Sequence, residues 1–157
     1  MPFQVAVCGP AECTDREGDA AYRVGRLLAE RGAVVLCGGG TGVMAAVAAG
    51  ARSRGGLVVG IRPGATRDGA STDLSAVVVT NIGEARNAVI VQSADAVIVV
   101  GGSWGTLSEL ALARRRGGVR VVSLGGWRVV NADGTEVPGV DHVATPDEAV
   151  RLACAPT

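Results

Sequence analysis

Ala33-Val34-Val35-Leu36-Cys37-Gly38-Gly39-Gly40-Thr41-Gly42-Val43-Met44 decides the fold of this chain. In this stretch an apolar, strand-like run leads through a glycine-rich turn directly into a helix-like pattern. Gly101-Gly102-Ser103-Trp104-Gly105-Thr106 follows another apolar run in the same way. Glycines let the backbone approach an anion closely, and the first free N–H groups of the following helix point to the same place with the positive end of the helix dipole. Two such turns in one small chain predict a nucleotide-like phosphate ester held between two loops.

Apolar segments of this kind alternate with helical patterns along the chain. The strand-like segments are Val5 to Cys8, Ala33 to Cys37, Leu57 to Ile61, Val77 to Val79, Ala96 to Val100 and Val119 to Leu124. The helical patterns run from Thr14 or Asp15 to Arg31, Val43 to Arg54, Glu84 to Ala94 and Thr106 to Arg116. The strands are continuously apolar, as strands covered on both faces must be, which indicates a mostly parallel sheet. We therefore expect an α/β fold: a doubly wound, Rossmann-like sheet of about six to seven strands with helices on both faces.

Local signals place the ends of several elements. Thr14-x-x-Glu17 forms a capping box at the start of the first helix, and Thr145 followed by Pro146 predicts a short last helix. Asn131-Ala132-Asp133-Gly134 predicts a tight turn and is compatible with an antiparallel hairpin after Trp127. The segment 63–75, rich in Gly, Thr, Ser and Asp, is the longest connection, and both a flap over a ligand and an ordinary surface loop fit it.

Length and charge limit the class of protein. A length of 157 residues is typical of one domain, so we expect residues 1–157 to form a single Rossmann-like nucleotide- or phosphate-binding unit. The net charge is zero and Arg114-Arg115-Arg116 is the one basic cluster, which argues against a nucleic-acid partner. No apolar stretch approaches the length of a membrane span and the N-terminus lacks a basic signal-peptide region, so we expect a cytoplasmic protein without membrane contact.

The side-chain chemistry argues against two kinds of cofactor site. All fifteen basic residues are arginine, which excludes pyridoxal phosphate held as a lysine aldimine. The four cysteines show no Cys-x-x-Cys spacing, and His142, expected in a late loop, is the one histidine of the sequence. We therefore expect no metal site.

The third helical pattern predicts a second subunit. Ala88-Val89-Ile90-Val91 places apolar residues around most of the circumference of this helix. A helix without a polar face is buried on several sides. In so small a domain we expect another subunit to supply the second covering surface, and hence a homodimer or homotetramer.

Trp104 and Trp127 belong to segments expected at one end of the sheet. Tryptophan has a large flat ring and is seldom fully buried. Two interpretations therefore fit both residues: they stack on a ligand, or they plug the edge of the core.

The predicted ligand site lies at the carboxyl ends of the strands, because doubly wound sheets bind ligands there, at the point where the strand order reverses. The turns that end at this edge carry Gly9 to Thr14, Gly38 to Gly42, Glu84 to Asn87 and Gly101 to Glu109. No Gly-x-Gly-x-x-Gly follows the first strand, and no acidic residue stands clearly about 20 residues further on, so the pattern does not favour NAD.

Three motifs together resemble the superfamily that contains the Lonely Guy cytokinin-activating phosphoribohydrolases, the proteins formerly mislabelled lysine decarboxylases, and the molybdenum cofactor carrier-like proteins. These motifs are Cys37 to Met44, Gly83-Glu84-Ala85-Arg86-Asn87 and Gly101 to Glu109. The Gly-Glu-Ala-Arg-Asn segment is most similar to the carrier-like branch. The resemblance extends from Val5 to about Leu124.

The resemblance implies site residues. In the phosphoribohydrolases a Pro-Gly-Gly-x-Gly-Thr-x-x-Glu motif supplies phosphate contacts and a catalytic glutamate, and an upstream Arg-Lys pair supplies a catalytic arginine. Glu109 and Arg86 match these two catalytic residues, whereas Gly101, Ser103 and Asn87 depart from the motif proline, the second motif glycine and the lysine. The candidate ligand-binding residues are Gly9, Gly38, Gly39, Gly40, Thr41, Gly42, Gly102, Ser103, Trp104, Gly105 and Thr106.

Each of these residues also has a purely structural interpretation. Thr106-x-x-Glu109 is itself a capping box, in which Glu109 would only satisfy an amide of its own helix. Arg86 is compatible with a surface or interface salt bridge, and Gly38 to Gly42 with a tight turn that binds nothing.

Two functions follow as expectations. The first is hydrolysis of the N-glycosidic bond of a nucleoside 5′-monophosphate without a cofactor, with Glu109 stabilising the oxocarbenium-like transition state and Arg86 holding Glu109 in place. The second is a non-catalytic carrier or sensor that binds molybdenum cofactor, another phosphorylated pterin or a nucleotide in the same cradle. A partner-binding domain without a small ligand is a third, more distant alternative.

Overall fold

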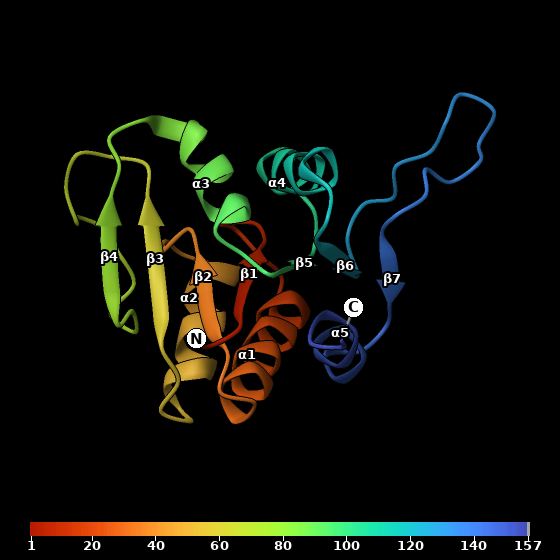
Figure 1. Ribbon diagram of the computed structural model, residues 1–157. Coiled ribbons are helices and arrows are strands. Elements are labelled where there is room, and N and C mark those ends of the chain that lie inside the picture. The colour runs from red at the N-terminus through yellow and green to blue at the C-terminus, as the bar shows by residue number, and fades with distance from the viewer. Residues whose placement is uncertain (157) are drawn as a thin grey trace.

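The computed structural model describes residues 1–156 and contains one seven-stranded sheet whose neighbouring strands are all parallel (Figure 1). The strand order is β4-β3-β2-β1-β5-β6-β7. The strands are β1 (Gln4–Cys8), β2 (Val34–Cys37), β3 (Val58–Arg62), β4 (Ala76–Val79), β5 (Ala96–Val100), β6 (Arg120–Leu124) and β7 (Asp141–Val143). The order reverses between β1 and β5, so the sheet is doubly wound, as predicted.

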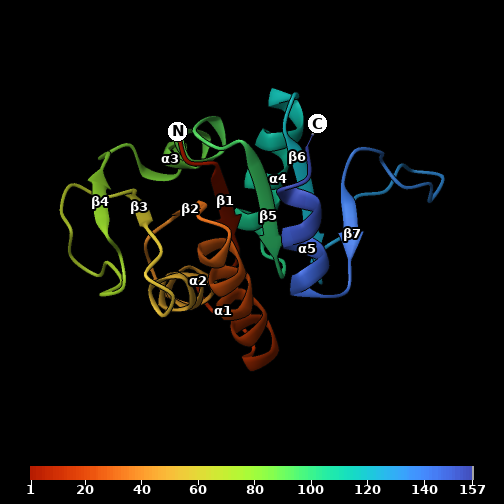
Figure 2. The same cartoon turned by 60° about the horizontal axis from the view of Figure 1, so that its bottom comes forward.

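Helices cover both faces of this sheet (Figures 1 and 2). Three of them, α1 (Asp15–Glu30), α2 (Val43–Arg52) and α5 (Pro146–Ala153), pack on one face with Val5, Val7 and Ile98. The other face carries the 3-10 turn η1 (Gly83–Ala85), α3 (Arg86–Gln92) and α4 (Trp104–Arg116), and the two helices pack with Ala6, Val97 and Val99. Successive residues of β1 and β5 thus enter opposite cores, which explains why these strands are apolar without alternation.

Two predicted helix starts are confirmed. The Thr14 hydroxyl accepts a hydrogen bond from the Glu17 amide at 3.1 Å and donates one to the Glu17 carboxylate at 3.1 Å. Thr145 caps α5 and accepts from the Glu148 amide at 3.2 Å. None of the helices within residues 1–156 is long and apolar enough to cross a membrane.

Two predictions differ from the structure in the type of element. The third helix was expected from Glu84 to Ala94, but α3 begins at Arg86 and ends at Gln92, because Gly83 to Ala85 form a tighter 3-10 turn. His142 was expected in a loop, but it lies in β7, where it pairs with Ser123 of β6. A strand of three residues carries too few side chains to show a periodic pattern.

The hairpin predicted after Trp127 is confirmed, and it projects away from the sheet as a narrow arm (Figure 1). Val130 and Glu136 form an antiparallel bridge, and the amide of Val137 donates to the carbonyl of Val129 at 3.1 Å.

The apolar residues of α3, from which a second subunit was predicted, are covered within the single chain. Ile90 is 0% exposed and Val91 is 1% exposed in the single chain. Both residues pack in the core between the sheet and α4, and Val89 is half-buried against the same core. The burial of this helix therefore requires no second subunit.

Candidate functional site

A small cavity lies at the carboxyl ends of β1 and β5, the two strands between which the order reverses. Its volume is about 180 Å³. The turns after β1 and β5, the starts of α3 and α2, and the first two turns of α4 meet around it. The lining residues are Gly9, Ala11, Met44, Glu84, Arg86, Asn87, Ser103, Gly105, Thr106 and Glu109.

The turn from β5 into α4 forms one wall of this cavity. Gly101 has a φ of 70°, a conformation that residues with a side chain rarely adopt, and the Glu17 carboxylate lies where a Gly101 side chain would stand. Ser103 then caps α4, and its hydroxyl accepts from the Thr106 amide at 3.2 Å. The helix therefore begins at Trp104, two residues before the predicted start, and directs its N-terminus toward the cavity.

This helix start excludes the capping interpretation of Glu109. Thr106 occupies the third helical position, where it hydrogen-bonds Ser103, so Glu109 lies nearly one turn further along α4. Glu109 is 8% exposed and lines the cavity. A buried carboxylate without a capping role carries a desolvation penalty that needs another explanation.

The surroundings of Glu109 bring its titration close to neutral pH. Burial raises the pKa of Glu109 to about 7, and the charge of Glu84 acts in the same direction. The positive charge of Arg86 and a hydrogen bond from the Cys8 thiol lower the pKa but do not cancel the effect of burial. Both the ionised and the neutral carboxyl are therefore available near pH 7, as acid–base chemistry requires.

Cys8 was not predicted as part of the site. It is 2% exposed at the end of β1, and burial, followed by the nearby Glu109 charge, raises the pKa of its thiol well above the ordinary value. Cys8 is thus a neutral donor toward Glu109. Its position at the end of a strand adjacent to β5 was the signal that could have identified it.

Arg86 reaches the cavity from the start of α3. Its Nη1 donates to the carbonyl of Gly38 at 2.7 Å and to the carbonyl of Ile61 at 2.5 Å, which ties α3 to the ends of β2 and β3. Within residues 1–156 it forms no ion pair with Glu109, and the two charges interact only through space. Arg86 therefore does not hold Glu109 directly, contrary to the expectation.

Asn87 stands where the phosphoribohydrolase motif has lysine. Its side chain is 6% exposed, and its Nδ2 donates to the Ser108 hydroxyl at 3.3 Å. Its Oδ1 has no hydrogen-bond partner among the described residues. Asn87 thus adds a polar amide to the cavity wall, but it supplies no charge.

The glycine loop after β2 lies beneath side chains instead of lining the cavity. Gly38, Gly39 and Gly40 are buried. A Cβ on Gly38 would come within 2.7 Å of Arg86 Nη1, and one on Gly40 within 3.0 Å of Arg62 Nη1. These glycines therefore make room for two arginines, of which Arg62 was not predicted.

The same loop is locked to the turn after β1. Thr41 donates through its hydroxyl to the carbonyl of Ala11 at 3.0 Å, and the Val43 amide donates to the carbonyl of Pro10 at 3.1 Å. Gly42, with a φ of 63°, places its Cα against these carbonyls, so no side chain fits there. The loop after β2 thus supports Gly9 and Ala11, which do line the cavity.

The two tryptophans contact each other beside the start of α4. Their rings meet edge to face with centroids 5.0 Å apart. Trp127 packs over Gly102, where a Cβ would come within 2.6 Å of its Nε1, whereas Trp104 is 78% exposed. Trp127 therefore packs on the start of α4 but remains 43% exposed, and Trp104 contacts Trp127 while most of its ring meets solvent.

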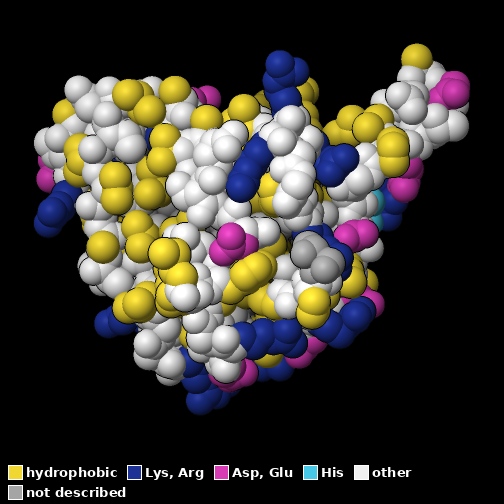
Figure 3. Space-filling model, in the orientation of Figure 1, with side chains coloured by type: hydrophobic (Ala, Val, Ile, Leu, Met, Phe, Trp, Pro, Cys, Tyr) yellow, Lys and Arg dark blue, Asp and Glu magenta, His cyan; other side chains and the backbone are white. Residues whose placement is uncertain are grey.

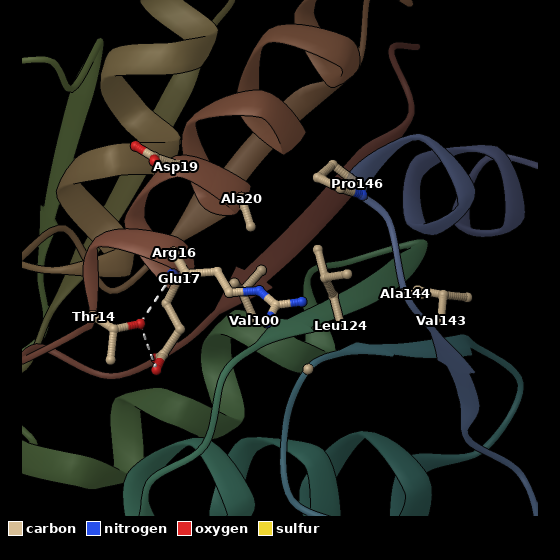
Figure 4. A pocket seen from close by; sticks show the side chains of 11 residues that line it. Thr14, Arg16, Glu17, Asp19, Ala20, Val100, Leu124, Val143, Ala144 and Pro146 are labelled. Atoms are coloured by element: carbon tan, nitrogen blue, oxygen red, sulfur yellow. Dashed lines mark hydrogen bonds between the residues drawn. The ribbon is translucent and has the colours of Figure 1, made fainter.

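A larger cavity of about 550 Å³ lies on the other face of the sheet, between the first turns of α1 and α5 (Figure 4). Val100 and Leu124 form its floor, and the side chain of Arg16 extends into it. Thr14, at the end of the turn after β1, lines this cavity, but Arg86, Glu109 and the candidate ligand-binding residues do not. Across residues 1–156, no group of three or more His, Cys, Asp or Glu side chains gathers as metal ligands would.

Known proteins are similar to this chain over nearly its whole length. An uncharacterised protein of Archaeoglobus fulgidus is 44% identical over 149 residues, which cover 95% of this chain and 93% of that protein. The solved structure of a molybdenum cofactor binding protein from Rippkaea orientalis is 30% identical, with a TM-score of 0.84, and the alignment covers 97% of this chain and 95% of that one.

An enzyme is also similar, over a shorter region. The cytokinin riboside 5′-monophosphate phosphoribohydrolase of Mycobacterium tuberculosis is 38% identical over 95 residues, which cover 59% of this chain and 51% of the enzyme. The resemblance inferred from the three motifs is therefore confirmed. Residues 2–150 match the profile of the SLOG cluster4 family, and the chain belongs to that family.

Proposed function

We propose that the 180 Å³ cavity binds the sugar–phosphate part of a nucleoside 5′-monophosphate and that Glu109 promotes hydrolysis of its N-glycosidic bond. The observation that carries this proposal is Glu109 itself, a carboxyl that is 8% exposed, lines the cavity and has no capping role. Burial raises its pKa to about 7, at a cost in stability. Such a cost is typical of a group retained for chemistry.

The start of α4 provides the phosphate subsite. The first N–H groups of a helix and the positive end of its dipole attract a phosphate, and Gly105 allows the backbone to approach it closely. The hydroxyls of Ser103 and Thr106 already hydrogen-bond each other at 2.9 Å, which fixes the shape of this turn. The dianionic phosphate would thus lie at one end of the cavity, with Glu109 further along the same helix.

Hydrolysis adds water across the bond between C1′ of the ribose and the base. The hydroxyl goes to C1′, and the base leaves with the electron pair of the broken bond and takes up a proton. Ionised Glu109 opposes the positive charge that develops on the sugar and orients the attacking water. Arg86 acts on Glu109 through its field, because it favours the ionised form, and the exposed ring of Trp104 stacks on the base.

The partial similarity to the M. tuberculosis phosphoribohydrolase supports this chemistry. The test is release of free base from a panel of nucleoside 5′-monophosphates, followed by chromatography. We expect one base to be released by the native protein and none by Glu109→Gln. Glu84→Gln is the matched control, because Glu84 lines the same cavity but is exposed. Equal loss of activity in both variants, or full activity in Glu109→Gln, would leave Glu109 without a catalytic role.

A second candidate function is non-catalytic binding of molybdenum cofactor. Two observations favour it: the R. orientalis molybdenum cofactor binding protein matches nearly the whole chain, and Asn87 supplies no charge where the phosphoribohydrolase motif has lysine. The same phosphate subsite would hold the phosphate of the pterin. Native mass spectrometry of protein purified from a host that makes the cofactor separates the two functions, because a retained pterin favours the carrier and base release favours the hydrolase.

A further inference from the structure

The larger cavity, of about 550 Å³ between the first turns of α1 and α5, takes no part in the proposed hydrolysis. Its floor is a row of apolar side chains at the carboxyl ends of three neighbouring strands. Val100, Leu124 and Val143 end β5, β6 and β7, and they are paired with one another across the sheet. Open α/β sheets bind ligands outside the carboxyl ends of their strands. The cavity therefore lies where a second ligand can bind, away from Glu109.

The size and the lining of this cavity are typical of a small-molecule site. Such sites enclose about 300 to 1,000 Å³ and are mostly apolar, with a few polar groups that fix the orientation of the ligand. The apolar walls above the floor come from α1 and from the segment before and at the start of α5: Ala20, Ala144 and Pro146. The polar side chains come from the start of α1: Thr14, Arg16, Glu17 and Asp19. This lining favours an organic molecule over an inorganic ion.

Arg16 is the one cation among the described residues that line this cavity. Figure 4 shows its side chain extending from α1 into the cavity toward Leu124, while Glu17 is directed to Thr14. None of the ion pairs within residues 1–156 includes Arg16. Figure 3 shows other arginine side chains projecting outward over α4, whereas the Arg16 guanidinium lies in a hollow. The cavity thus holds a positive charge without a partner above an apolar floor.

The place of Arg16 in α1 has an energetic cost. The helix begins at Asp15, so Arg16 lies in the first turn, where the positive end of the helix dipole disfavours a cation. Asp15 and Glu17 have the favourable sign at this end, and Arg16 stands between them with the unfavourable one. A residue that opposes a local preference is expected where function supplies a compensating contact. An anion bound to the guanidinium supplies that contact.

We propose that this cavity binds a small carboxylate with an apolar body, and that Arg16 holds the carboxylate. The planar guanidinium presents parallel N–H donors that match the two oxygens of a carboxylate. The apolar body covers the row formed by Val100, Leu124 and Val143. One guanidinium neutralises one carboxylate, whereas a phosphate dianion would leave a negative charge above this apolar floor. The site is independent of the proposed hydrolysis, because the two cavities share no lining residue.

Phenylacetate and its neutral analogue phenylacetamide test the pairing with Arg16, because they share the ring and nearly the same shape. Calorimetry on the native protein should give a dissociation constant about 10-fold lower for phenylacetate, since a hydrogen-bonded charge pair adds to the apolar contact. Arg16→Gln should remove this preference. Arg67→Gln is the matched control and should keep it, because Arg67 is likewise exposed but lies between β3 and β4 at the opposite edge of the sheet. No binding of phenylacetate at millimolar concentration, equal affinities for the acid and the amide, or an unchanged preference in Arg16→Gln would overturn the proposal.

A second variant tests whether phenylacetate occupies this cavity. Ala144 is exposed and lines the cavity wall, so Ala144→Trp should obstruct the cavity without disturbing the core. This variant should keep the native circular dichroism spectrum and lose binding of phenylacetate and phenylacetamide alike. Neither ribose 5-phosphate nor inorganic phosphate should displace phenylacetate from the native protein. Full binding to Ala144→Trp, or displacement by either phosphate compound at equal concentration, would contradict the proposed carboxylate site.

Discussion

Replacing Glu109 by glutamine should make the folded protein more stable at neutral and alkaline pH while it removes turnover. Glutamine keeps the volume of the side chain and its place in α4, but it carries no charge that must lose water on burial. The pKa of Glu109 rises from its ordinary value of 4.5 to about 7. One pKa unit corresponds to about 1.4 kcal/mol, so the ionised carboxylate costs the folded state about 3 kcal/mol.

The stability difference between Glu109→Gln and the native protein should depend on pH. Below pH 4.5 the carboxyl is protonated in both the folded and the unfolded chain, so the variant should gain nothing there. Between pH 4.5 and about 7 the unfolded chain loses the proton first, and the free energy of unfolding of the native protein falls as the pH rises. Above pH 7 the penalty is complete and constant.

Thermal unfolding of both proteins from pH 4 to pH 9 provides the assay. For a chain of this length, about 3 kcal/mol corresponds to a rise in Tm of about 6 to 12 °C for Glu109→Gln at pH 8, and to no difference at pH 4. Glu84→Gln, which changes an exposed carboxylate at the same cavity, should leave Tm nearly unchanged. A variant that is equally or less stable than the native protein at pH 8 would refute the assignment of Glu109 as a buried carboxylate that costs stability.

Three further predictions concern the same cavity. The rate of base release by the native protein should rise with pH and level off above about 7, because the ionised form of Glu109 is the active one. A rate that falls as the pH rises toward 7 would assign Glu109 as a proton donor instead. Arg86→Gln should lower the free energy of unfolding by about 1 to 3 kcal/mol in denaturant titrations, because the carbonyls of Gly38 and Ile61 lose their hydrogen-bond donor. An unchanged free energy of unfolding would contradict those hydrogen bonds. Trp104→Ala should leave Tm within a few degrees of the native value, because the side chain is exposed. In calorimetry it should weaken nucleotide binding by about 1 kcal/mol, or about fivefold. An unchanged affinity would show that Trp104 does not stack on the base.

The strand pattern carried most of the information about the fold. Val5 to Cys8 and Ala96 to Val100 are apolar at every position because successive residues enter the two cores on opposite faces of the sheet. That pattern predicts parallel strands and helices on both faces, as the structure has them. The sequence does not reveal β7, because Asp141 to Val143 pair along one edge only and carry no periodic signal.

The candidate site could be predicted only in part from the sequence. Ser103, Gly105, Thr106 and Glu109 line the cavity because they follow β5 at the point where the strand order reverses, whereas Gly102 and Trp104 do not line it. The role of Gly38 to Gly40 was not visible, because glycines that admit an anion and glycines that admit an arginine side chain look the same in sequence. Arg62 and Cys8 are single residues at strand ends, and only the spatial order of the strands brings them to the site.

The three apolar residues of α3 illustrate a limit of helical periodicity. Val89, Ile90 and Val91 point in different directions around the helix, which predicts several covering surfaces. The sheet and α4 together provide those surfaces within one chain. Periodicity indicates how many sides of a helix are covered, but it does not indicate which element covers them.

A crystal structure of the protein with ribose 5-phosphate tests directly whether the cavity holds the sugar–phosphate beside Glu109, because this compound is the sugar product of the proposed hydrolysis and needs no turnover to bind. We expect the phosphate to contact the backbone amides at the start of α4, beside Ser103 and Gly105, and the C1 hydroxyl of the sugar to point toward the Glu109 carboxyl. Ribose 5-phosphate bound elsewhere, or bound with C1 directed away from Glu109, would contradict this expectation.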